Sequence, residues 1–157
     1  MKYKEYEYDK IGNLIMITRY KGADNDVTVP SEIEGCKVTY IGQGTFSYCT
    51  SIKSVALPEG ITIIGDNAFW GCRNLKSITL PNSVAEIGKQ AFWRCEKLKN
   101  VELPESLITI GNFAFRYCES LENITIPESV TEIGKKAFWN CPNLENIEIP
   151  KGVEFTS

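Results

Sequence analysis

The sequence predicts a solenoid, in which short strands of successive coils stack in parallel along one axis and share a single core. Three observations predict this fold. A cysteine recurs every 23 residues, and isoleucine–glycine and proline columns recur with the same period. No single unit carries enough apolar side chains to offset the entropy lost when its backbone is ordered. Each coil must therefore bury its faces against its neighbours, as repeats in a solenoid do.

Composition narrows the class of protein. The 157 residues are 43% hydrophobic and 24% charged, which is typical of one globular domain. The net charge of −3 argues against nucleic-acid binding, which needs clustered cations. Histidine is absent, so catalytic systems with a histidine base and histidine-ligated metal sites are excluded. We therefore predict that the protein is not an enzyme and binds no metal or cofactor.

Residues 1–40 are predicted to form an N-terminal cap and the lead-in coil. Tyr6 and Tyr8 have the two-residue spacing of a strand face, as do Ile15 and Ile17, and the polar segment between the two pairs suits a turn. A hairpin at this place would cover the open strand edge of the first coil.

The N-terminus carries no targeting pattern. The residues after Met1 are charged and aromatic, so we expect no signal peptide. The longest apolar run, 14–17, is far too short to cross a bilayer. We expect no insertion into a membrane.

Residues 41–157 are predicted to hold five repeats in unbroken register. Each repeat reads I-G-x-x-A-F-x-x-C-x-x-L-x-x-[IV]-x-[LI]-P-x-x-[VIL]-x-x. The five units are 41–63, 64–86, 87–109, 110–132 and 133–155. Because no insertion interrupts them, equivalent side chains of successive units are expected to lie directly over one another.

The stretch 75–95 illustrates the expected local structure. Residues 75–80 alternate apolar and polar side chains, which predicts a short half-buried strand. Pro81 ends this strand because proline has no N–H for the ladder. Residues 84–87 predict a second extended piece, and the Ala-Phe-x-x-Cys segment 91–95 has the apolar spacing of one or two helical turns.

The cysteine column is predicted to be a ladder of buried, reduced thiols. Stacked coils would place these thiols about 4.8 Å apart with parallel Cβ vectors, whereas a disulfide requires Cβ atoms about 3.8 Å apart that face each other. A redox or metal ladder is the functional alternative. Cys36 lies outside the column, and two alternatives stay open for it: a disulfide with Cys49, or an exposed thiol.

The repeat resembles the BspA-type leucine-rich repeat, a variant of 23 residues found in bacteria and protists. The resemblance covers residues 41–155, and residues 27–35 resemble the N-terminal unit of that family. It implies a leucine-rich-repeat solenoid, a right-handed β/α-type superhelix of short parallel strands and short helical turns, forming one domain with the N-terminal β-hairpin cap. It also implies an arc-shaped recognition domain without catalytic residues.

The resemblance further implies a place in a cell-surface or secreted, adhesin-like protein that binds other proteins or cells. Buried free thiols, by contrast, are typical of a reducing compartment. These two indications disagree, and we expect the biological context to follow the resemblance.

One candidate binding surface is an aromatic stripe. All three tryptophans occupy one column of the repeat, an arginine takes the fourth place in that column, and two tyrosines follow one position later. Aromatic and arginine side chains dominate binding hot spots and also suit sugar stacking, although rings that merely seal the outer wall would show the same pattern. The aromatic stripe consists of Trp70, Trp93, Arg116, Trp139, Tyr48 and Tyr117.

The alternative candidate surface is the strand face, formed by the outward side chains of the first predicted strand of each repeat. Its rim column changes from lysine to glutamate along the stack, which would orient a charged partner or would simply be solvated polarity. The residues of this strand face are Lys53, Lys76, Lys99, Asn100, Glu102, Glu122, Asn123, Glu145, Asn146 and Glu148.

We therefore predict a non-enzymatic module for protein recognition or adhesion, with a protein or glycan partner. The alternative is a structural spacer or self-associating scaffold domain of a larger protein. The C-terminus leaves three arrangements open, because residues 153–157 begin a further turn that no polar capping unit follows. In the first arrangement Phe155 folds back as a lid, in the second the chain is cut from a longer protein, and in the third two C-terminal faces form a homodimer.

Overall fold

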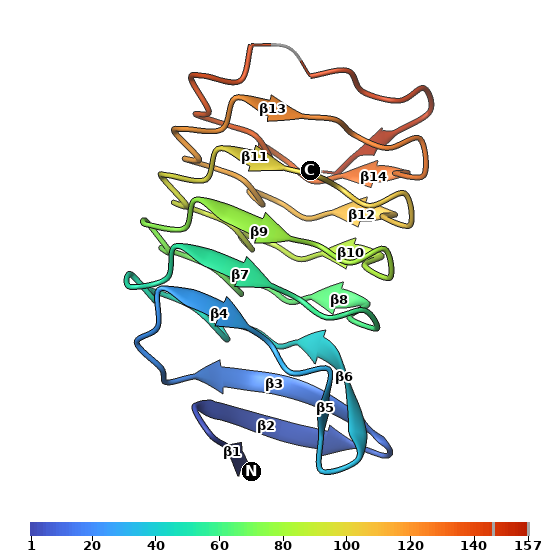
Figure 1. Cartoon of the computed structure of the whole chain (residues 1–157). Helices are drawn as coiled ribbons and strands as arrows, with labels where there is room; N and C mark the ends of the chain where they lie inside the picture. Colours follow the sequence, from blue (N-terminus) through green and yellow to red (C-terminus); the bar gives the residue numbers. More distant parts are fainter. Residues whose placement is uncertain (146, 157) are drawn as a thin grey trace.

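The structure is a computed structural model that describes residues 1–145 and 147–156 (Figure 1). In these residues the chain forms two parallel-stranded walls and a third wall of turns, which together enclose the core. The strands are β1 (Lys2–Tyr3), β2 (Tyr6–Ile11), β3 (Leu14–Tyr20), β4 (Asp26–Thr28), β5 (Glu32–Ile33), β6 (Cys36–Ile41), β7 (Ser54–Ala56), β8 (Ile63–Ile64), β9 (Ser77–Thr79), β10 (Glu86–Ile87), β11 (Asn100–Val101), β12 (Thr109–Ile110), β13 (Asn123–Ile124), β14 (Glu132–Ile133) and β15 (Glu154–Phe155).

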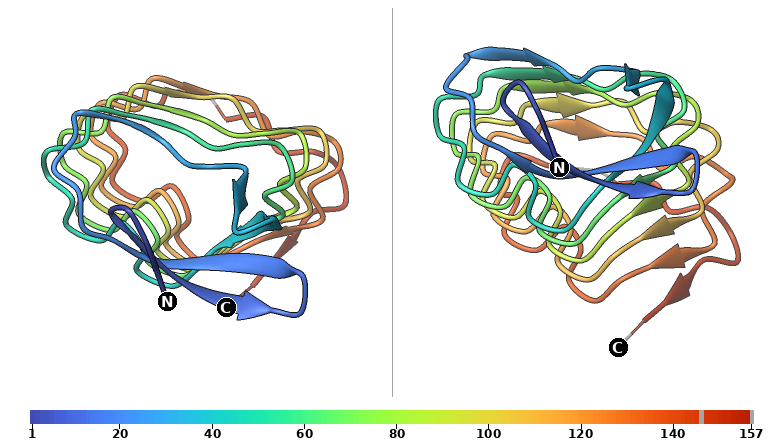
Figure 2. Two further views of the ribbon diagram at one scale, coloured as in Figure 1. Left: turned by 60° about the horizontal axis from the view of Figure 1, so that its bottom comes forward. Right: turned by 90° about the horizontal axis from the view of Figure 1, so that it is seen from below.

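Two sheets run the length of the stack. The first has the order β1-β2-β3-β6-β8-β10-β12-β14-β15, with β5 paired to β6, and the second has the order β13-β11-β9-β7-β4. Strands of successive repeats pair in parallel with a register of one repeat, as in Ser54↔Ser77 and Asn100↔Asn123. The fold is therefore a leucine-rich-repeat β-solenoid of about six turns, whose coils lie over one another when viewed from the N-terminal end (Figure 2).

The third wall consists of turns, so the expected short helical turns are wrong. We call it the turn wall; it comprises residues 42–49, 65–72, 88–95, 111–118 and 134–141. No helix occurs in the part of the chain that the structure describes. Alternate amides close turns on residues three positions back, as Trp70 N–H does on Asn67 O over 3.0 Å.

In the first four repeats, the amides at the fourth, sixth and eighth positions of the turn wall donate to the next coil. Asn67 N–H donates to Lys89 O over 2.9 Å, and Gly71 N–H donates to Trp93 O over 2.8 Å. Asn67 and Gly71 both have positive φ angles, of 57° and 73°. Two left-handed residues four positions apart interrupt any right-handed helix, and they turn the amides toward the neighbouring coil.

Stacked phenylalanine rings fill the centre of the solenoid. Phe69 and Phe92 lie with ring centroids 5.2 Å apart and planes 1° from parallel, and the neighbouring pairs are similar. Phe69, Phe92 and Phe115 are fully buried. The column stacking predicted from the repeat is confirmed.

A hairpin lies against the first coil. Strands β2 and β3 pair antiparallel, and β3 pairs in parallel with β6. Ile15, Ile17 and Tyr20 are buried, and the Tyr20 ring lies 5.3 Å from that of Phe46, in line with the phenylalanine stack. That this hairpin acts as a cap remains a prediction.

The C-terminal segment adds a strand to the first sheet. β15 pairs in parallel with β14, matching Ile133 with Phe155. The Phe155 side chain is 67% exposed, so the expectation that it folds back as a lid is wrong.

The glycine column sets how closely the coils approach. A Cβ on Gly111 would lie 2.5 Å from Lys89 N and 2.6 Å from Gly88 C, both backbone atoms of the preceding coil. The backbone cannot move aside as a flexible side chain could. Any side chain in this column would force two coils apart.

We expect Gly111→Ala to destabilise the protein by about 1–3 kcal/mol, because the added methyl group overpacks the contact between coils. The free energy of unfolding in urea measures this. Thr131→Ala, at an exposed position of the same repeat, is the control and should change stability by less than about 0.5 kcal/mol. Equal stability of wild type and Gly111→Ala would contradict the close approach.

Candidate interaction surfaces

The cysteine column forms an internal hydrogen-bond ladder rather than a reactive site. All six cysteines are free. Cys95 Sγ donates to Phe69 O over 3.3 Å and Cys118 Sγ donates to Phe92 O over 3.2 Å. Burial raises the pKa of both thiols well above the usual value and raises the pKa of Cys141 to about 11. Since the thiolate is the nucleophile, these thiols are unreactive.

Two cysteines depart from the predicted positions. Cys49 is only partly buried, because it belongs to the first repeat and no earlier phenylalanine carbonyl of the column lies below it. Cys36 is buried and free, so both alternatives, a disulfide with Cys49 and an exposed thiol, are wrong.

We expect iodoacetamide to modify the partly exposed Cys49 in the native protein at about pH 8, slowly because partial burial raises its pKa as well, while Cys95 and Cys118 stay protected by full burial and by pKa values well above the usual value. Mass spectrometry of peptides from the labelled protein measures this, with labelling in urea as the control. Labelling of Cys95 as fast as Cys49 without unfolding would rule out the buried ladder.

Two further classes of site find no support in the described residues. No group of three or more His, Cys, Asp or Glu side chains in residues 1–145 and 147–156 is placed to hold a metal ion. Within the same residues, no helix has the length and apolar character needed to cross a membrane.

The aromatic stripe is continuous on the turn wall. Tyr48 and Trp70 have ring centroids 5.2 Å apart, and Trp70 and Trp93 are 6.1 Å apart. Beyond them, Tyr117 lies 6.3 Å from Trp93 and 5.5 Å from Trp139. The structure therefore brings all five rings predicted from the sequence into one row.

Arg116 lies among the rings of this row. Its guanidinium carbon is 4.8 Å from the ring centroid of Trp93 and 4.5 Å from that of Trp139, with Tyr117 at 4.9 Å and Phe113 at 5.2 Å. Such cation–π contacts favour the charged side chain in a partly desolvated place. None of the salt bridges in the described residues involves Arg116, so its positive charge has no carboxylate partner.

The two ends of the stripe are the most accessible. Tyr48 is 57% exposed and Trp139 is 44% exposed, whereas Trp70, Trp93 and Tyr117 are partly buried. Both end rings belong to terminal repeats, where a neighbouring repeat covers them on one side only. The ends therefore offer aromatic surface that the fold itself does not use.

At several positions of the stripe, the backbone adopts a left-handed conformation that destabilises bulky residues. Tyr48, Phe113 and Tyr117 have φ angles of 58°, 59° and 60°, in the left-handed region that bulky residues rarely adopt. Glycine takes the place equivalent to Tyr48 and Tyr117 in the second repeat, at Gly71, where a Cβ would lie 2.8 Å from the Tyr48 ring. The fold retains aromatic side chains at positions that would be easier for glycine or asparagine.

The strand face lies on the outer side of the second sheet. Lys53, Lys76 and Lys99 are exposed on it, and Lys99 pairs with Glu122 over 3.2 Å. The side chains of Asn123 and Asn100 hydrogen-bond over 3.4 Å. Among the other residues predicted for this face, Glu102, Glu145 and Glu148 are exposed, and Asn146 lies outside the described residues.

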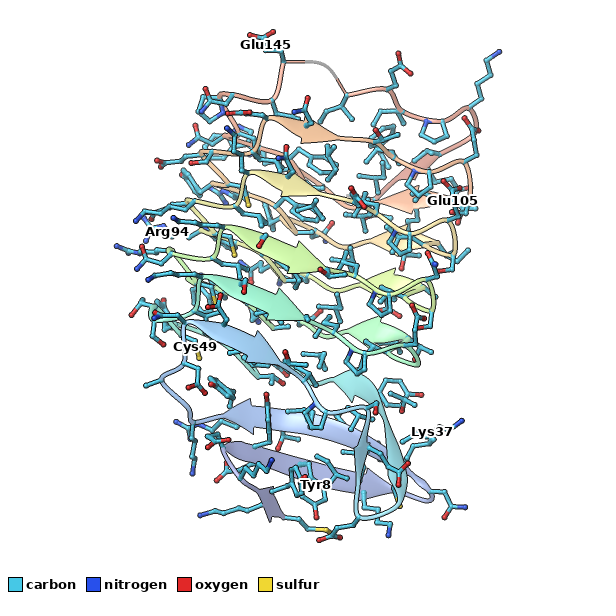
Figure 3. The ribbon with its side chains drawn as sticks, viewed as in Figure 1. Tyr8, Lys37, Cys49, Arg94, Glu105 and Glu145 are labelled. Atoms are coloured by element: carbon cyan, nitrogen blue, oxygen red, sulfur yellow. The ribbon has the colours of Figure 1, made fainter. Side chains whose placement is uncertain are left out.

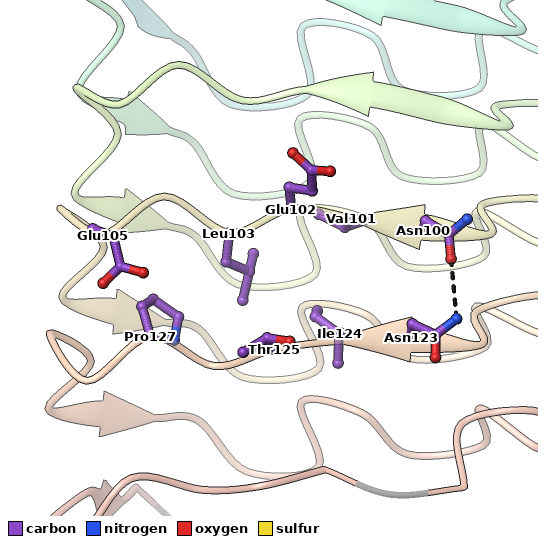
Figure 4. A pocket seen from close by; sticks show the side chains of 9 residues that line it. All are labelled: Asn100, Val101, Glu102, Leu103, Glu105, Asn123, Ile124, Thr125 and Pro127. Carbon is purple, nitrogen blue, oxygen red and sulfur yellow. Dashed lines mark hydrogen bonds between the residues drawn. The ribbon is translucent and has the colours of Figure 1, made fainter.

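The structure has a hollow on the strand face that no pattern in the sequence predicts. Between β11 and β13 a space of about 380 Å³ is lined by Val101, Leu103, Ile124 and Pro127, among others, with Glu105 at its edge (Figure 4). The backbones of these repeats separate here. Leu57 N–H donates to Thr79 O over 3.3 Å, and the described residues show no equivalent bond from the amides one and two repeats along, at 80 and 103.

The aligned repeats identify the family. Residues 38–157 match the model of the BspA-type leucine-rich repeat region in six copies. The chain belongs to this family.

Several solved structures of leucine-rich repeat proteins share the fold. The protein of T. pallidum is 30% identical with a TM-score of 0.87, and the match covers 99% of this chain and 85% of that one. A protein of Bacteroides ovatus is also 30% identical with a TM-score of 0.87, covering 99% of this chain and 43% of that one. A leucine-rich cell surface protein of Faecalibacterium prausnitzii is 26% identical with a TM-score of 0.71, covering 94% and 53%. No curated protein matches the chain significantly.

The BspA-type repeat explains why both candidate surfaces are rows of side chains. Leucine-rich repeats are generally scaffolds for protein interaction rather than enzymes. A BspA-type solenoid presents rows of side chains on gently curved walls, and both candidate surfaces of this chain are such rows.

Proposed function

We propose that this BspA-type domain is a non-enzymatic recognition module of the adhesion type, which binds a protein partner through the aromatic stripe. The observation that carries the proposal is the exposure of Tyr48 and Trp139 at the ends of a continuous row of rings that surrounds an unpaired arginine. Tryptophan, tyrosine and arginine are the residues most enriched in binding hot spots. The strained backbone at Tyr48 and Tyr117 supports the same role, since strain is commonly retained where function needs it.

We place the module in a surface or secreted protein. The description of the Faecalibacterium prausnitzii relative as a cell surface protein supports this. The shared fold and 26% identity make that protein a fair guide to the kind of molecule in which such a domain occurs.

The second candidate function is a spacer or scaffold that associates through its C-terminal face. The amides of Lys136, Phe138 and Asn140, which in earlier repeats would donate to a following coil, donate to no group in the described chain. However, these amides all face the same way. A two-fold dimer that joined the two turn walls would set donors against donors, which disfavours symmetric pairing at this wall.

We expect Trp139→Ala to weaken partner binding by about tenfold or more. Binding of the immobilised domain to a panel of purified extracellular proteins and glycans, followed by affinity measurement for each hit, tests this. Ile108→Ala is the matched control, because Ile108 is 42% exposed but lies outside the turn wall. Equal losses from both variants would refute a role for the stripe, and hits among glycans alone would refute a protein partner.

A further inference from the structure

We propose that the partner segment bound by the aromatic stripe is acidic: a stretch of polypeptide that carries carboxylates beside apolar side chains. This inference rests on the proposed function and names the chemistry of the partner. It follows from the charges around the stripe, from the polarity of the backbone beneath it, and from the orientation of its rings.

The turn wall is strongly basic although the chain as a whole is acidic. At the third, fourth, seventh and eighth positions of the repeats, which flank the buried alanine and phenylalanine, five residues are cationic and one is acidic. The single acid is already engaged, because Asp66 Oδ1 accepts the Lys89 backbone N–H over 2.7 Å. The cations are Lys89, Arg94, Arg116, Lys135 and Lys136.

These cations are available to a partner. The salt bridges of the described residues involve none of them. Lys89, Arg94, Lys135 and Lys136 are exposed, and in Figure 3 Arg94 projects from the turn-wall edge, on the side opposite Glu105. Arg94 and Lys136 also lie over rings of the stripe, 5.8 Å from the centroid of Tyr117 and 5.4 Å from that of Trp139. Positive charge and aromatic surface therefore occur together.

The backbone reinforces this positive charge. In the first four repeats, the amides at the fourth, sixth and eighth positions each donate to a carbonyl of the next coil, as in Phe69 to Ala91 over 2.7 Å and Phe92 to Ala114 over 2.7 Å, whereas the glycine amide of each repeat donates back to the preceding coil. The peptide dipoles in these columns add, as they do along a helix axis, and their positive end is at the last coil. Lys135 and Lys136 lie at that same end.

The strand face has the opposite character near the same end of the solenoid. Glu102, Glu122, Glu145 and Glu148 are exposed there, and Glu105 borders the hollow (Figure 4). The two faces therefore differ in sign. An acidic segment would be attracted to the turn wall and repelled by the strand face, which fixes where it binds.

Ring orientation favours a polypeptide over an anionic polysaccharide. Adjacent rings of the stripe are tilted by 47° for Tyr48 and Trp70, by 39° for Trp70 and Trp93, and by 84° for Tyr117 and Trp139, and the 22° between Trp93 and Tyr117 is the smallest angle in the row. Such rings form no flat platform along which a chain of sugars could stack. They form separate facets that suit individual apolar side chains, while the cations between them suit carboxylates.

The test is selection of a displayed library of random peptides against the intact domain. We expect the enriched peptides to be acidic and to contain apolar or aromatic residues, and their binding to weaken as salt concentration rises. Lys89→Glu/Lys135→Glu should lower their affinity by about tenfold or more. The matched control, Lys53→Glu/Lys76→Glu, makes the same charge change at exposed sites of the strand face and should leave affinity unchanged.

Three results would overturn the inference: enriched peptides that are neutral or basic, equal effects of the two double variants, or no enrichment at all. Circular dichroism verifies that both variants fold. The outcome is distinguishable from failure of the proposed function. If Trp139→Ala weakens binding to a protein from the panel while Lys89→Glu/Lys135→Glu does not, the stripe is the binding surface and only the acidic character of the partner is wrong.

Discussion

Hydrogen bonds between coils hold this solenoid together, and those of the turn wall constrain it most. In the first four repeats, the amides at the fourth, sixth and eighth positions have their acceptors on the next coil rather than within their own turn, as for Asn67, Phe69 and Gly71. A coil without its neighbour would leave these amides unpaired, at a cost of about 1–3 kcal/mol for each one kept from water. The same bonds fix the repeat length, because a single inserted residue would shift each donor away from its acceptor.

This constraint explains why the protein presents rows and not deep cavities. Once the register is fixed, equivalent positions form columns, and the chemistry of a column repeats along the stack. The phenylalanine column fills the core, while the tryptophan column lies outside it. Arg116 occupies a tryptophan place in that column, and its planar guanidinium stacks with rings much as another ring would. The row therefore stays continuous and gains a charge.

The sequence predicts those features of the structure that repeat at equivalent positions of every unit. The register, the two strands of each of the first four repeats, the buried thiols of later repeats and the row of tryptophans all follow from the period of 23 residues. The helical turns were wrong because Ala-Phe-x-x-Cys spacing is common to a helix and to consecutive turns. The left-handed residues that distinguish them include Asn67, Gln90, Arg94 and Phe113, so no glycine column marks these positions.

Other features depend on a particular repeat rather than on the repeat pattern. Cys49 is half-buried only because no earlier coil supplies its acceptor carbonyl. The hollow beside β11 and β13 arises where the backbones of two neighbouring repeats separate, and the residues there match the consensus as well as any others. Deviations of this kind depend on contacts between specific coils, which a consensus averages out.

Net charge is a poor guide to the partners of a repeat protein, and this chain shows the reason. Its charge of −3 is a sum over faces of opposite sign. At physiological ionic strength, exposed charges act over about 8 Å, so an approaching partner responds to the face that it meets rather than to the sum. In a solenoid each face is a small set of columns, and the charge of those columns can be read directly from the aligned repeats. The cations of the turn wall are hidden in the overall composition but stand out once the third, fourth, seventh and eighth positions are compared across repeats.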